Sequence, residues 1–418
     1  MIVEPTAGKS PPDSSADTMM ASGAQTLDAP HQVASQRGQG GSRPTTSRMG
    51  SVLPEVRSKG ETLVLVPRDA TRYVHDQLLG RGGMGEVQLA TDHDIGRKVA
   101  VKRVLAADNP HAVARFIDEI RTVGNLEHPN IVPIHDVGVD DDGALFFVMK
   151  YVEGETLADV IGKLAAGDSA YHARYSFEHR LELFAGLLRA LKYAHSRGLV
   201  HRDIKPENIM VGAFGEVMLM DWGIAHQLDA DKRVTLAVSP VPRVAKAAAE
   251  GTVVGTPQYM SPEQAAGEVA GLDGRSDLYS AFTVLFELLT LTPYVRPGGS
   301  AVQTVLAVQD RTLPGVRDAV FDHSAQPAVA VELRHFLRHG LVPAKDDRFP
   351  DAAEALAELE RVRAGDFAVE CAVTLLKSNN TRLGRFMDEY PSGSLVLAAG
   401  TGAAVLLGLA GWVAFALS

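Results

Sequence analysis

The sequence contains a single cysteine, Cys371, so no disulfide bond can form within the chain. This scarcity fits a catalytic region that works in a reducing compartment. No residue type near Cys371 in the sequence suggests an activated thiol. We therefore interpret Cys371 as a small buried apolar residue and not as a nucleophile.

An excess of positive charge is also missing. The chain holds 41 Lys and Arg against 51 Asp and Glu, which gives a formal net charge of −10. Proteins that bind nucleic acid in bulk usually present a basic surface, so no nucleic-acid partner is expected. Apolar residues at 45% and charged residues at 22% are typical of a globular protein, and 418 residues suffice for one large or two moderate domains.

Residues 1–72 contain no aromatic side chain, and Tyr73 is the first aromatic residue of the chain. The segment from Met1 to about Gly60 is rich in Ser, Thr, Pro and Gly, and such a segment buries too little apolar surface to offset its ordering entropy. We predict a disordered tail over residues 1–70, either a plain solvated tail or a regulatory arm that becomes phosphorylated. Its start lacks a basic region followed by an apolar stretch, so we do not expect a signal peptide.

A glycine cluster follows the first β-type run. Runs at 73–79, 86–91 and 98–103 are typical of strands, and Gly80-Arg81-Gly82-Gly83-Met84-Gly85-Glu86-Val87 joins the first two. Glycines let the backbone approach phosphates closely. The pattern also opens dinucleotide-binding folds, but those need a helix after the turn, whereas here a second strand follows. Lys102 closes the next apolar run, where it either extends to water or holds phosphates.

A polar stretch, His201-Arg202-Asp203-Ile204-Lys205-Pro206-Glu207-Asn208, carries three residues whose chemistry fits together. Asp203 can accept a proton from a hydroxyl, Lys205 can neutralise charge on a phosphoryl group, and Asn208 can bind a metal. Phosphoryl transfer depends mainly on positioning and electrostatics of this kind. A predicted amphipathic helix at 176–197 precedes the stretch.

In this order the motifs resemble the protein kinase superfamily, and specifically the eukaryotic-like Ser/Thr kinases of bacteria, over residues 73–363. The resemblance implies an α+β, bilobal fold. A small β-rich lobe with one helix would cover residues 73–150, and a larger helical lobe would cover 153–363. The helix is expected at 112–126, and the resemblance pairs its Glu119 with Lys102.

The resemblance also implies the ATP site. It implies that Met149 lines the back of the adenine pocket and that the backbone of the next three residues binds the adenine edge. The residues assigned to ATP are Leu79, Gly80, Gly82, Gly83, Gly85, Val87, Ala100, Lys102, Glu119, Met149, Lys150, Tyr151 and Val152.

Catalytic and metal-binding roles follow from the same resemblance. Asp203 and Lys205 would be catalytic, while Asn208 and Asp221 would bind Mg²⁺, with Mn²⁺ as a substitute. Asp221 opens Asp221-Trp222-Gly223, in which Trp222 stands where the family usually has phenylalanine. Its aromatic body keeps the packing role, so activity is expected to survive.

Regulatory and structural roles come from the resemblance as well. Thr252 occupies the position most often phosphorylated, and Arg202 is the partner for that phosphate. Thr256 matches a threonine that usually contacts Asp203 and Lys205 in the stretch 201–208, which is the family's catalytic loop, so its first role would be structural. Three residues are assigned structural roles. Glu263 is expected to pair with Arg348, and Asp277 to hold the backbone around His201 and Arg202.

The segment at 394–417 is apolar throughout and carries no charge. About 24 residues at ~1.5 Å each give ~36 Å, which spans a hydrocarbon core of ~30 Å. A buried core helix is the alternative. Lys377, Arg382 and Arg385 lie in the preceding juxtamembrane segment, 364–393, so the sequence predicts one span of the inner membrane with the catalytic region on the cytoplasmic side.

The combined prediction is a Ser/Thr protein kinase in bacterial signalling that uses MgATP and phosphorylates protein substrates and its own activation loop. Its further partners would be the membrane and a second copy of the kinase. The alternative is a pseudokinase or membrane scaffold that does no chemistry. Lys102, Glu119, Asp203, Asn208 and Asp221 are all present, which favours the enzyme, because scaffolds commonly lose one of them.

Overall fold

The computed structural model of the chain describes residues 50–377 with several gaps. The undescribed residues within this range are 52, 60–61, 67–69, 83–84, 105–109, 223–225, 228–256, 269–270, 297–299, 310–320, 367, 369–370, 372 and 375–376. Most of the expected tail and the whole apolar segment 394–417 lie outside the described residues.

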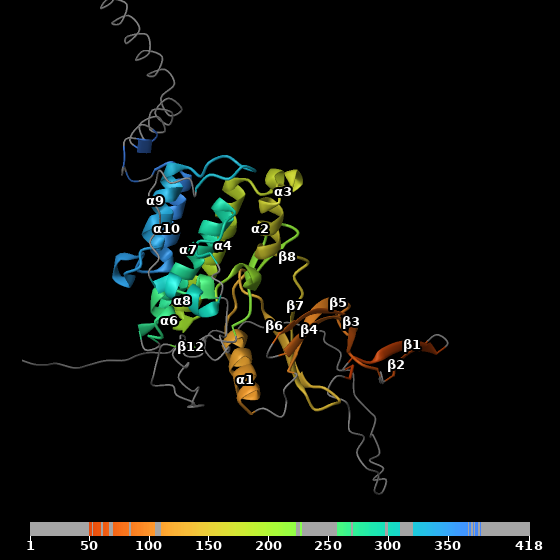
Figure 1. Ribbon diagram of the computed structural model, residues 1–418. Coiled ribbons are helices and arrows are strands. Elements are labelled where there is room, and N and C mark those ends of the chain that lie inside the picture. The colour runs from red at the N-terminus through yellow and green to blue at the C-terminus, as the bar shows by residue number, and fades with distance from the viewer. Residues whose placement is uncertain are drawn as a thin grey trace, which may run out of the picture. The chain divides into compact units, whose positions relative to one another are not determined.

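A five-stranded antiparallel sheet forms the smaller lobe (Figure 1). Its spatial order is β3-β4-β5-β7-β6. The strands are β3 (Tyr73–Gly82), β4 (Gly85–Asp92), β5 (Arg97–Val104), β6 (Ile134–Val139) and β7 (Leu145–Lys150). The runs predicted at 73–79, 86–91 and 98–103 coincide with β3, β4 and β5, so the prediction of these three strands is confirmed.

Two hairpin turns of this sheet lie wholly within the described residues, one between β4 and β5 and one between β6 and β7. Gly96 and Gly143 both have positive φ, +71° and +81°, a conformation that L side chains rarely adopt. The turn at 140–143 is held by a bond from Gly143 N to Asp140 O of 3.1 Å, and the Asp140 side chain accepts from Ala144 N at 2.8 Å. The acidic run at this point therefore forms a hairpin tip, as its glycine and aspartates predict.

One described helix, α1 (Pro110–Gly124), packs on the sheet. Its Phe116 lies 5.2 Å from the ring of Phe147 on β7, and both belong to an apolar cluster with Val104. The helix predicted at 112–126 is thereby confirmed within two residues at each end.

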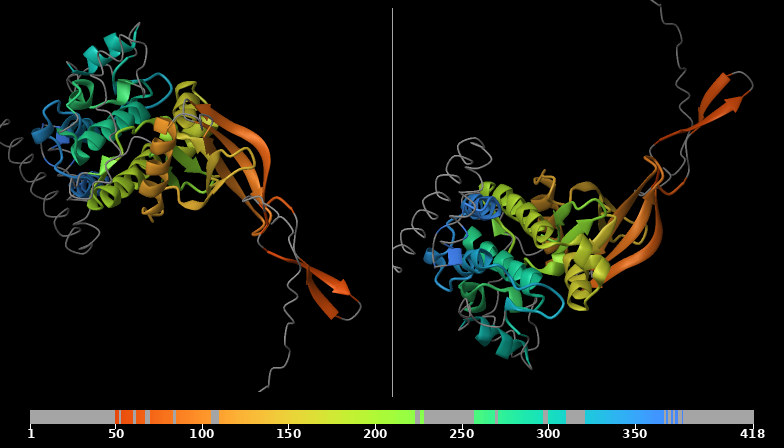
Figure 2. Two further views of the ribbon diagram at one scale, coloured as in Figure 1. Left: turned by 90° about the horizontal axis from the view of Figure 1, so that it is seen from below. Right: turned by 90° about the horizontal axis from the view of Figure 1, so that it is seen from above.

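The larger lobe is helical in its described part (Figures 1 and 2). Its α-helices are α2 (Leu157–Ala165), α3 (Ser169–Arg174), α4 (Phe177–Ser196), α6 (Pro262–Ala265), α7 (Gly274–Thr290), α8 (Ala301–Gln309), α9 (Val331–Gly340) and α10 (Ala352–Arg363). Three short helical turns are η1 (Pro206–Asn208), η3 (Pro257–Tyr259) and η6 (Lys345–Asp347). The α+β fold with a β-rich small lobe and a helical large lobe is confirmed.

The core of the large lobe lies around α4 and α7. Ser176, which with Glu178 is one of two capping candidates in the sequence, caps α4 and accepts a bond from His179 N at 3.3 Å. The rings of Phe184 on α4 and Phe282 on α7 meet edge to face at 5.3 Å, and Phe349 stacks on Phe282 at 5.4 Å. This aromatic packing fixes the helices on which the polar stretch 201–208 rests.

Short strands frame that stretch. In a three-stranded sheet, β10 (Ile209–Gly212) lies between β8 (Gly154–Thr156) and β11 (Val217–Leu219). A two-stranded pair joins β9 (Leu199–Val200) to β12 (His226–Gln227). The stretch 201–208 thus runs from the end of β9 to the start of β10, so both of its ends are fixed.

Two features differ from expectation, and a third concerns a segment without an assigned role. Residues 55–59 and 62–66, predicted to be disordered, form a hairpin of β1 (Glu55–Lys59) and β2 (Thr62–Val66), because β2 consists of β-favouring and aliphatic side chains and pairs in register with β1 along all five residues. The residues between Gly167 and Tyr175, which in the sequence resemble a small insertion of unknown role, contain helix α3. Cys371 is half-buried instead of buried, and bonds from the Thr374 backbone and the His335 side chain lower the pKa of its thiol to about 6.

No helix among the described residues is long and apolar enough to cross a membrane. The segment 394–417, on which that expectation rests, lies outside them.

Gly340 lies where α9 packs on α7, and an added Cβ there would lie 2.1 Å from Cγ of the buried Phe282. We predict that Gly340→Ala lowers the free energy of unfolding by about 1–3 kcal/mol through overpacking. Gly162→Ala on α2 is the matched control, since an added Cβ meets nothing within 4 Å there and alanine favours helix. Denaturant midpoints of the full chain test both; equal or greater stability of Gly340→Ala would contradict this packing.

Candidate active site

A half-buried lysine connects the two lobes. Lys102 Nζ on β5 lies 2.6 Å from Glu119 Oε1 on α1 and 3.0 Å from Asp221 Oδ1, which follows β11 in the large lobe. The Glu119 side chain is 4% exposed, whereas that of Asp221 is 45% exposed. The pair predicted between Lys102 and Glu119 is confirmed, and Asp221 joins it.

Burial lowers the pKa of Lys102, but the charges of Glu119 and Asp221 outweigh burial and leave this pKa above its ordinary value. Desolvation raises the pKa of Asp221, and Lys102 outweighs it, so this carboxyl has a pKa below its ordinary value. The site therefore presents a fixed ammonium beside a partly exposed carboxylate. Such a pair suits a ligand that carries both phosphates and a cation.

The stretch 201–208 brings its three predicted residues together. Lys205 Nζ lies 2.6 Å from Asp203 Oδ2, and the Asn208 side-chain amide donates to the same oxygen at 3.1 Å and to the Asp203 carbonyl at 2.8 Å. Among the described residues, no bond reaches Asp203 Oδ1. Within the described part of the chain, Oδ1 is therefore the carboxylate oxygen left to accept a proton from a substrate hydroxyl.

Asn208 and Asp221 fit a hard divalent cation. The Asn208 amide nitrogen is committed to Asp203, which leaves the amide oxygen for a cation. Asp221 supplies a carboxylate that is already ionised. Mg²⁺ prefers one or two protein oxygens together with phosphate oxygens and water, so this small donor set suits it. Among the described residues, no group of three or more His, Cys, Asp or Glu could hold a metal.

The carboxylate of Asp277, in the first turn of α7, holds the backbone that leads into Asp203. Its two oxygens accept the backbone N–H groups of His201 and Arg202, each at 2.8 Å, and His195 Nε2 lies 2.8 Å from one of them. Arg202 adopts a left-handed φ of +68°, which is uncommon for a residue with a side chain. The predicted structural role of Asp277 thus has a geometric basis.

His201 and Trp222 form a buried contact beneath this loop. His201 Nδ1 accepts from Asp203 N at 3.2 Å, so its Nε2 donates to Met220 O at 3.1 Å, and these two bonds assign the neutral Nε2–H tautomer. The Trp222 ring is 2% exposed and lies 4.6 Å from the His201 ring. Trp222 therefore packs on the catalytic loop, while its neighbour Asp221 takes a left-handed φ of +64°.

Five of the predicted nucleotide-binding residues, Gly80, Val87, Ala100, Lys102 and Met149, share one face of the sheet. Lys102 stands opposite Val87 on β4, Ala100 stands opposite Met149 on β7, and Gly80 stands opposite Val87. Directly opposed residues point to the same face, so these side chains line the face that carries the Lys102 ammonium. Leu79, beside an irregularity in β3, is 41% exposed.

Strand packing, and not only phosphate binding, requires a glycine at position 85. A Cβ at this position would lie 2.2 Å from the carbonyl oxygen of Arg103 on β5. The glycine thus lets β4 approach β5 where the glycine-rich segment returns to the sheet.

Sequence reasoning missed one apolar surface beside the segment between the lobes. Val132, Val152 and Met218 form a small buried cluster, and Met149, Met210 and Met220 pack against it. Met210 lies on β10, two residues after Asn208. This fixed distance from the Asn208 motif is the sequence signal that could have identified Met210 as a residue of the site. The cluster brings predicted adenine-binding residues of the small lobe against the large lobe.

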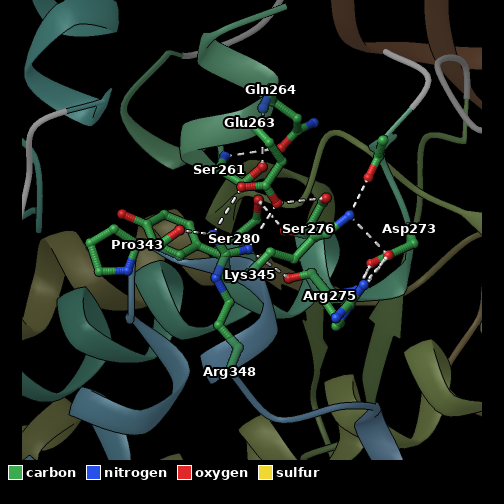
Figure 3. A network of polar contacts seen from close by, with 12 residues as sticks. Ser261, Glu263, Gln264, Asp273, Arg275, Ser276, Ser280, Pro343, Lys345 and Arg348 are labelled. Atoms are coloured by element: carbon green, nitrogen blue, oxygen red, sulfur yellow. Dashed lines mark hydrogen bonds and ion pairs between the residues drawn. The ribbon is translucent and has the colours of Figure 1, made fainter. Parts of the chain in front are cut away.

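A buried ion pair fixes the end of the long segment after Asp221 (Figure 3). Arg348 binds Glu263 through two bonds of 2.8 Å each, and Ser276 Oγ donates to Glu263 at 2.7 Å. The predicted pair of Glu263 and Arg348 is confirmed. Gln264, which sequence reasoning missed, donates to the Arg202 carbonyl at 2.9 Å and so ties this segment to the catalytic loop.

Gly83, Thr252 and Thr256 lie outside the described residues. Arg202, the predicted partner of Thr252, has a buried Nε without a hydrogen-bond partner among the described residues. Burial lowers the pKa of Arg202, against the opposing charge of Asp277.

Comparisons with known proteins agree with this geometry. Residues 73–358 match the family model described as protein kinase domain. A probable serine/threonine-protein kinase of Streptomyces coelicolor is 35% identical over 78% of this chain and 44% of its own length. Serine/threonine-protein kinase PknB of Mycolicibacterium smegmatis is 37% identical over 70% of this chain and 43% of its own length.

A third relative, probable serine/threonine-protein kinase PknB of Bifidobacterium longum, is 43% identical over 53% of this chain and 30% of its own length. The chain thus spans less than half the length of these curated relatives.

The Glu263–Arg348 pair leads to a stability prediction. Arg348→Met leaves a carboxylate buried without its cation, so we expect the free energy of unfolding at pH 7 to fall by about 3–5 kcal/mol. Desolvation raises the pKa of Glu263, but Arg348 outweighs it and holds this pKa below the ordinary 4.5. The stabilisation is therefore present above pH 4.5 and is lost as the pH falls through the lower folded value.

Denaturant unfolding of the full chain between pH 7 and pH 3 measures this difference, which should shrink on acidification. Arg361→Met is the control, because Arg361 is 56% exposed and pairs with Glu358 on the same helix, so its loss should change stability by about 0.5 kcal/mol or less. A pH-independent difference for Arg348→Met would show that the pair does not act through the charge of Glu263.

Proposed function

The chain belongs to the protein kinase family, and we propose that it transfers the γ-phosphoryl group of MgATP to Ser and Thr hydroxyls of proteins. The observation that carries this proposal is the link from Lys102 to both Glu119 and Asp221, at 2.6 and 3.0 Å. With that link in place, the phosphate-binding side chain of the small lobe and the cation-binding side chain of the large lobe occupy one site. A pseudokinase or scaffold would not need this arrangement.

Asp203 receives the proton of the substrate hydroxyl in this proposal. Its Oδ2 is held by Lys205 and Asn208, which orients the carboxylate and leaves Oδ1 toward the substrate. Lys205 places a positive charge next to the transferring group. Because the transition state asks mainly for orientation and charge, these fixed contacts supply what the protein must contribute.

ATP is held by the sheet face described above. The Lys102 ammonium binds the phosphates, and the backbone of the glycine-rich segment covers them. Val87, Ala100 and Met149 enclose the adenine from the small lobe, while Met210 closes the pocket from the large lobe. Asp221 and Asn208 would hold Mg²⁺, which neutralises charge on the phosphate oxygens when it is bound.

Regulation is proposed to act through Arg202. A half-buried guanidinium whose Nε has no partner among the described residues is stabilised by an anion nearby. Phosphorylation of Thr252 would supply that anion with strong acceptor oxygens. Arg202 directly precedes Asp203, so such a contact would order the catalytic loop and the long segment together.

The same proposal extends to the cellular setting, bacterial signalling at the inner membrane. The support is the uncharged apolar segment 394–417, preceded by basic residues at 377, 382 and 385. A single helix there would anchor the chain with its catalytic region on the cytoplasmic side.

Asp203→Asn tests the chemistry. We expect the full chain to incorporate phosphate from ATP into itself and into a generic protein substrate, and Asp203→Asn to lower that rate at least about 100-fold. The variant should keep the thermal stability and nucleotide affinity of the wild type. Asp142→Asn, a substitution at an 81% exposed hairpin tip, is the control that should keep full activity.

Phosphosite mapping by mass spectrometry on wild type and Asp203→Asn completes the experiment. Phosphate on Thr252 in the wild type alone would support autophosphorylation of the loop. Equal incorporation by the two proteins would remove the role given to Asp203. Nucleotide binding without transfer by the wild type would favour the pseudokinase instead.

A truncation tests the anchor separately. A chain that ends at Pro391 should appear in the soluble fraction of the cell, whereas the full chain should sediment with membranes and resist carbonate extraction. The apolar segment is the source of the difference, because its removal takes away about 24 uncharged residues. Continued sedimentation of the truncated chain with membranes would contradict the proposed span.

A further inference from the structure

The hairpin of β1 and β2 precedes the family domain, which begins at Tyr73. We call residues 50–72 the arm. All side chains of β1 and the first four of β2 are exposed. Leu63 and Leu65 are 75% and 67% exposed, respectively. Figures 1 and 2 show this hairpin beyond the end of β3 and β4, so the described part of the chain does not cover it.

The base of the arm is fixed to the small lobe. Gly50 and Thr71 form an antiparallel bridge, and Ser51 N donates to Ala70 O at 2.8 Å. The Ser51 hydroxyl also binds Asp94 in the turn between β4 and β5. At the end of the arm, Arg72 pairs with the fully buried Asp92 at 3.0 Å. The arm therefore leaves the lobe from an anchored base.

The two edges of the hairpin, with which no other described strand pairs, differ in charge. β1 carries Glu55, Arg57 and Lys59 along its edge, and charges of this kind discourage the addition of another strand. β2 reads Thr62-Leu63-Val64-Leu65-Val66, with no charge, no proline and mostly β-branched or aliphatic side chains. The edge of β2 is thus an unprotected template for strand pairing.

Both faces of β2 are apolar. In the observed register Leu65 stands opposite Val56, and Leu63 stands opposite Ser58, on one face. The other face carries Thr62, Val64 and Val66. A two-stranded hairpin is marginally stable in water by itself, so a third strand on this edge would both cover apolar surface and satisfy backbone groups.

We propose that β2 pairs antiparallel with β2 of a second copy of this chain, about a two-fold axis at Val64. In this register all five residues of each strand are paired. Val64 meets Val64 of the second copy, Leu63 meets Leu65, and Thr62 meets Val66, so each cross-strand contact is apolar or joins threonine to valine.

The placement of the charged residues of β1 favours a second copy of this chain as the partner of the β2 edge. The observed pairs Glu55–Val66 and Lys59–Thr62 place Glu55 and Lys59 in the outer strands of the resulting four-stranded sheet. Each of the two end rows of that sheet then begins with Glu55 of one copy and ends with Lys59 of the other, while Arg57 of each copy lies at either end of the central row. No like charges stand in adjacent strands, and the uncharged edge meets an identical uncharged edge.

The small area buried between the two β2 strands limits the affinity of the proposed dimer. A ladder of five residue pairs buries less than the about 1,200 Å² of a standard interface, so the dimer should be weak and concentration-dependent. The inference concerns assembly alone. It holds or fails independently of phosphoryl transfer.

Disulfide trapping tests the register. In a Cys371→Ser background, Val64→Cys should form a covalent dimer on mild oxidation, because directly opposed residues have Cα atoms about 4.5–5.5 Å apart. Arg57→Cys is the matched control, since Arg57 stands opposite Val64 on the same face of the same hairpin. The two copies of residue 57 would lie three strand spacings apart, roughly 14 Å, beyond the reach of a disulfide.

Dimer formed by Val64→Cys alone supports the proposal, while equal yields from both variants, or none from Val64→Cys, overturn it. Sedimentation velocity over a concentration series adds a measurement without cysteines. Wild type should shift toward the dimer, and Leu63→Lys/Leu65→Lys should stay monomeric, whereas Val56→Lys/Ser58→Lys, with the same added charge on β1, should still dimerise. A wild type that stays monomeric but binds anionic lipid vesicles through Leu63 and Leu65 would also overturn the proposal.

Discussion

The geometry of the catalytic loop depends on the carboxylate of Asp277. This side chain is 1% exposed, and it satisfies two backbone N–H groups that would otherwise be buried without partners, at a cost of about 1–3 kcal/mol each. The same bonds offset the left-handed φ of Arg202, a strain of about 1–3 kcal/mol. Because Asp277 belongs to the buried helix α7, the position of Asp203 is set by the core of the large lobe.

Charge is arranged around two cations, the half-buried Lys102 and the buried Arg348, which pair with carboxylates from distant segments. Lys102 joins β5, α1 and the segment after β11, whereas Arg348 joins the segment after η6 to the start of α6. Buried pairs of this kind contribute little net stability but strongly penalise the loss of one partner. They therefore determine which arrangement of the lobes and of the long segment is allowed. Gln264 extends this control to the Arg202 carbonyl.

The arm differs from the kinase domain that follows it in how its apolar residues are exposed to solvent. The family domain buries its apolar residues and places charge in a few paired sites. The arm instead exposes leucines and valines on a base held by Ser51 and Arg72. Composition led to a prediction of disorder because residues 1–70 contain no aromatic side chain, and five-residue runs at 55–59 and 62–66 are too short to change that average. Pairing between the two runs, which composition does not register, decided the outcome.

The sequence alone determined the elements with strong local signals. Alternating runs predicted the strands of the sheet, a cap and apolar spacing predicted α4, and motif order identified Lys102, Glu119, Asp203, Asn208 and Asp221. Such features depend on neighbours in the chain, so they can be read locally. Only the tertiary structure decided that Met210 joins the surface beneath Met149, that Gly85 must admit the Arg103 carbonyl and that Gln264 reaches Arg202. Each of these contacts joins segments that are distant in the sequence. Packing and strand register bring these segments together, and local residue order encodes neither packing nor register.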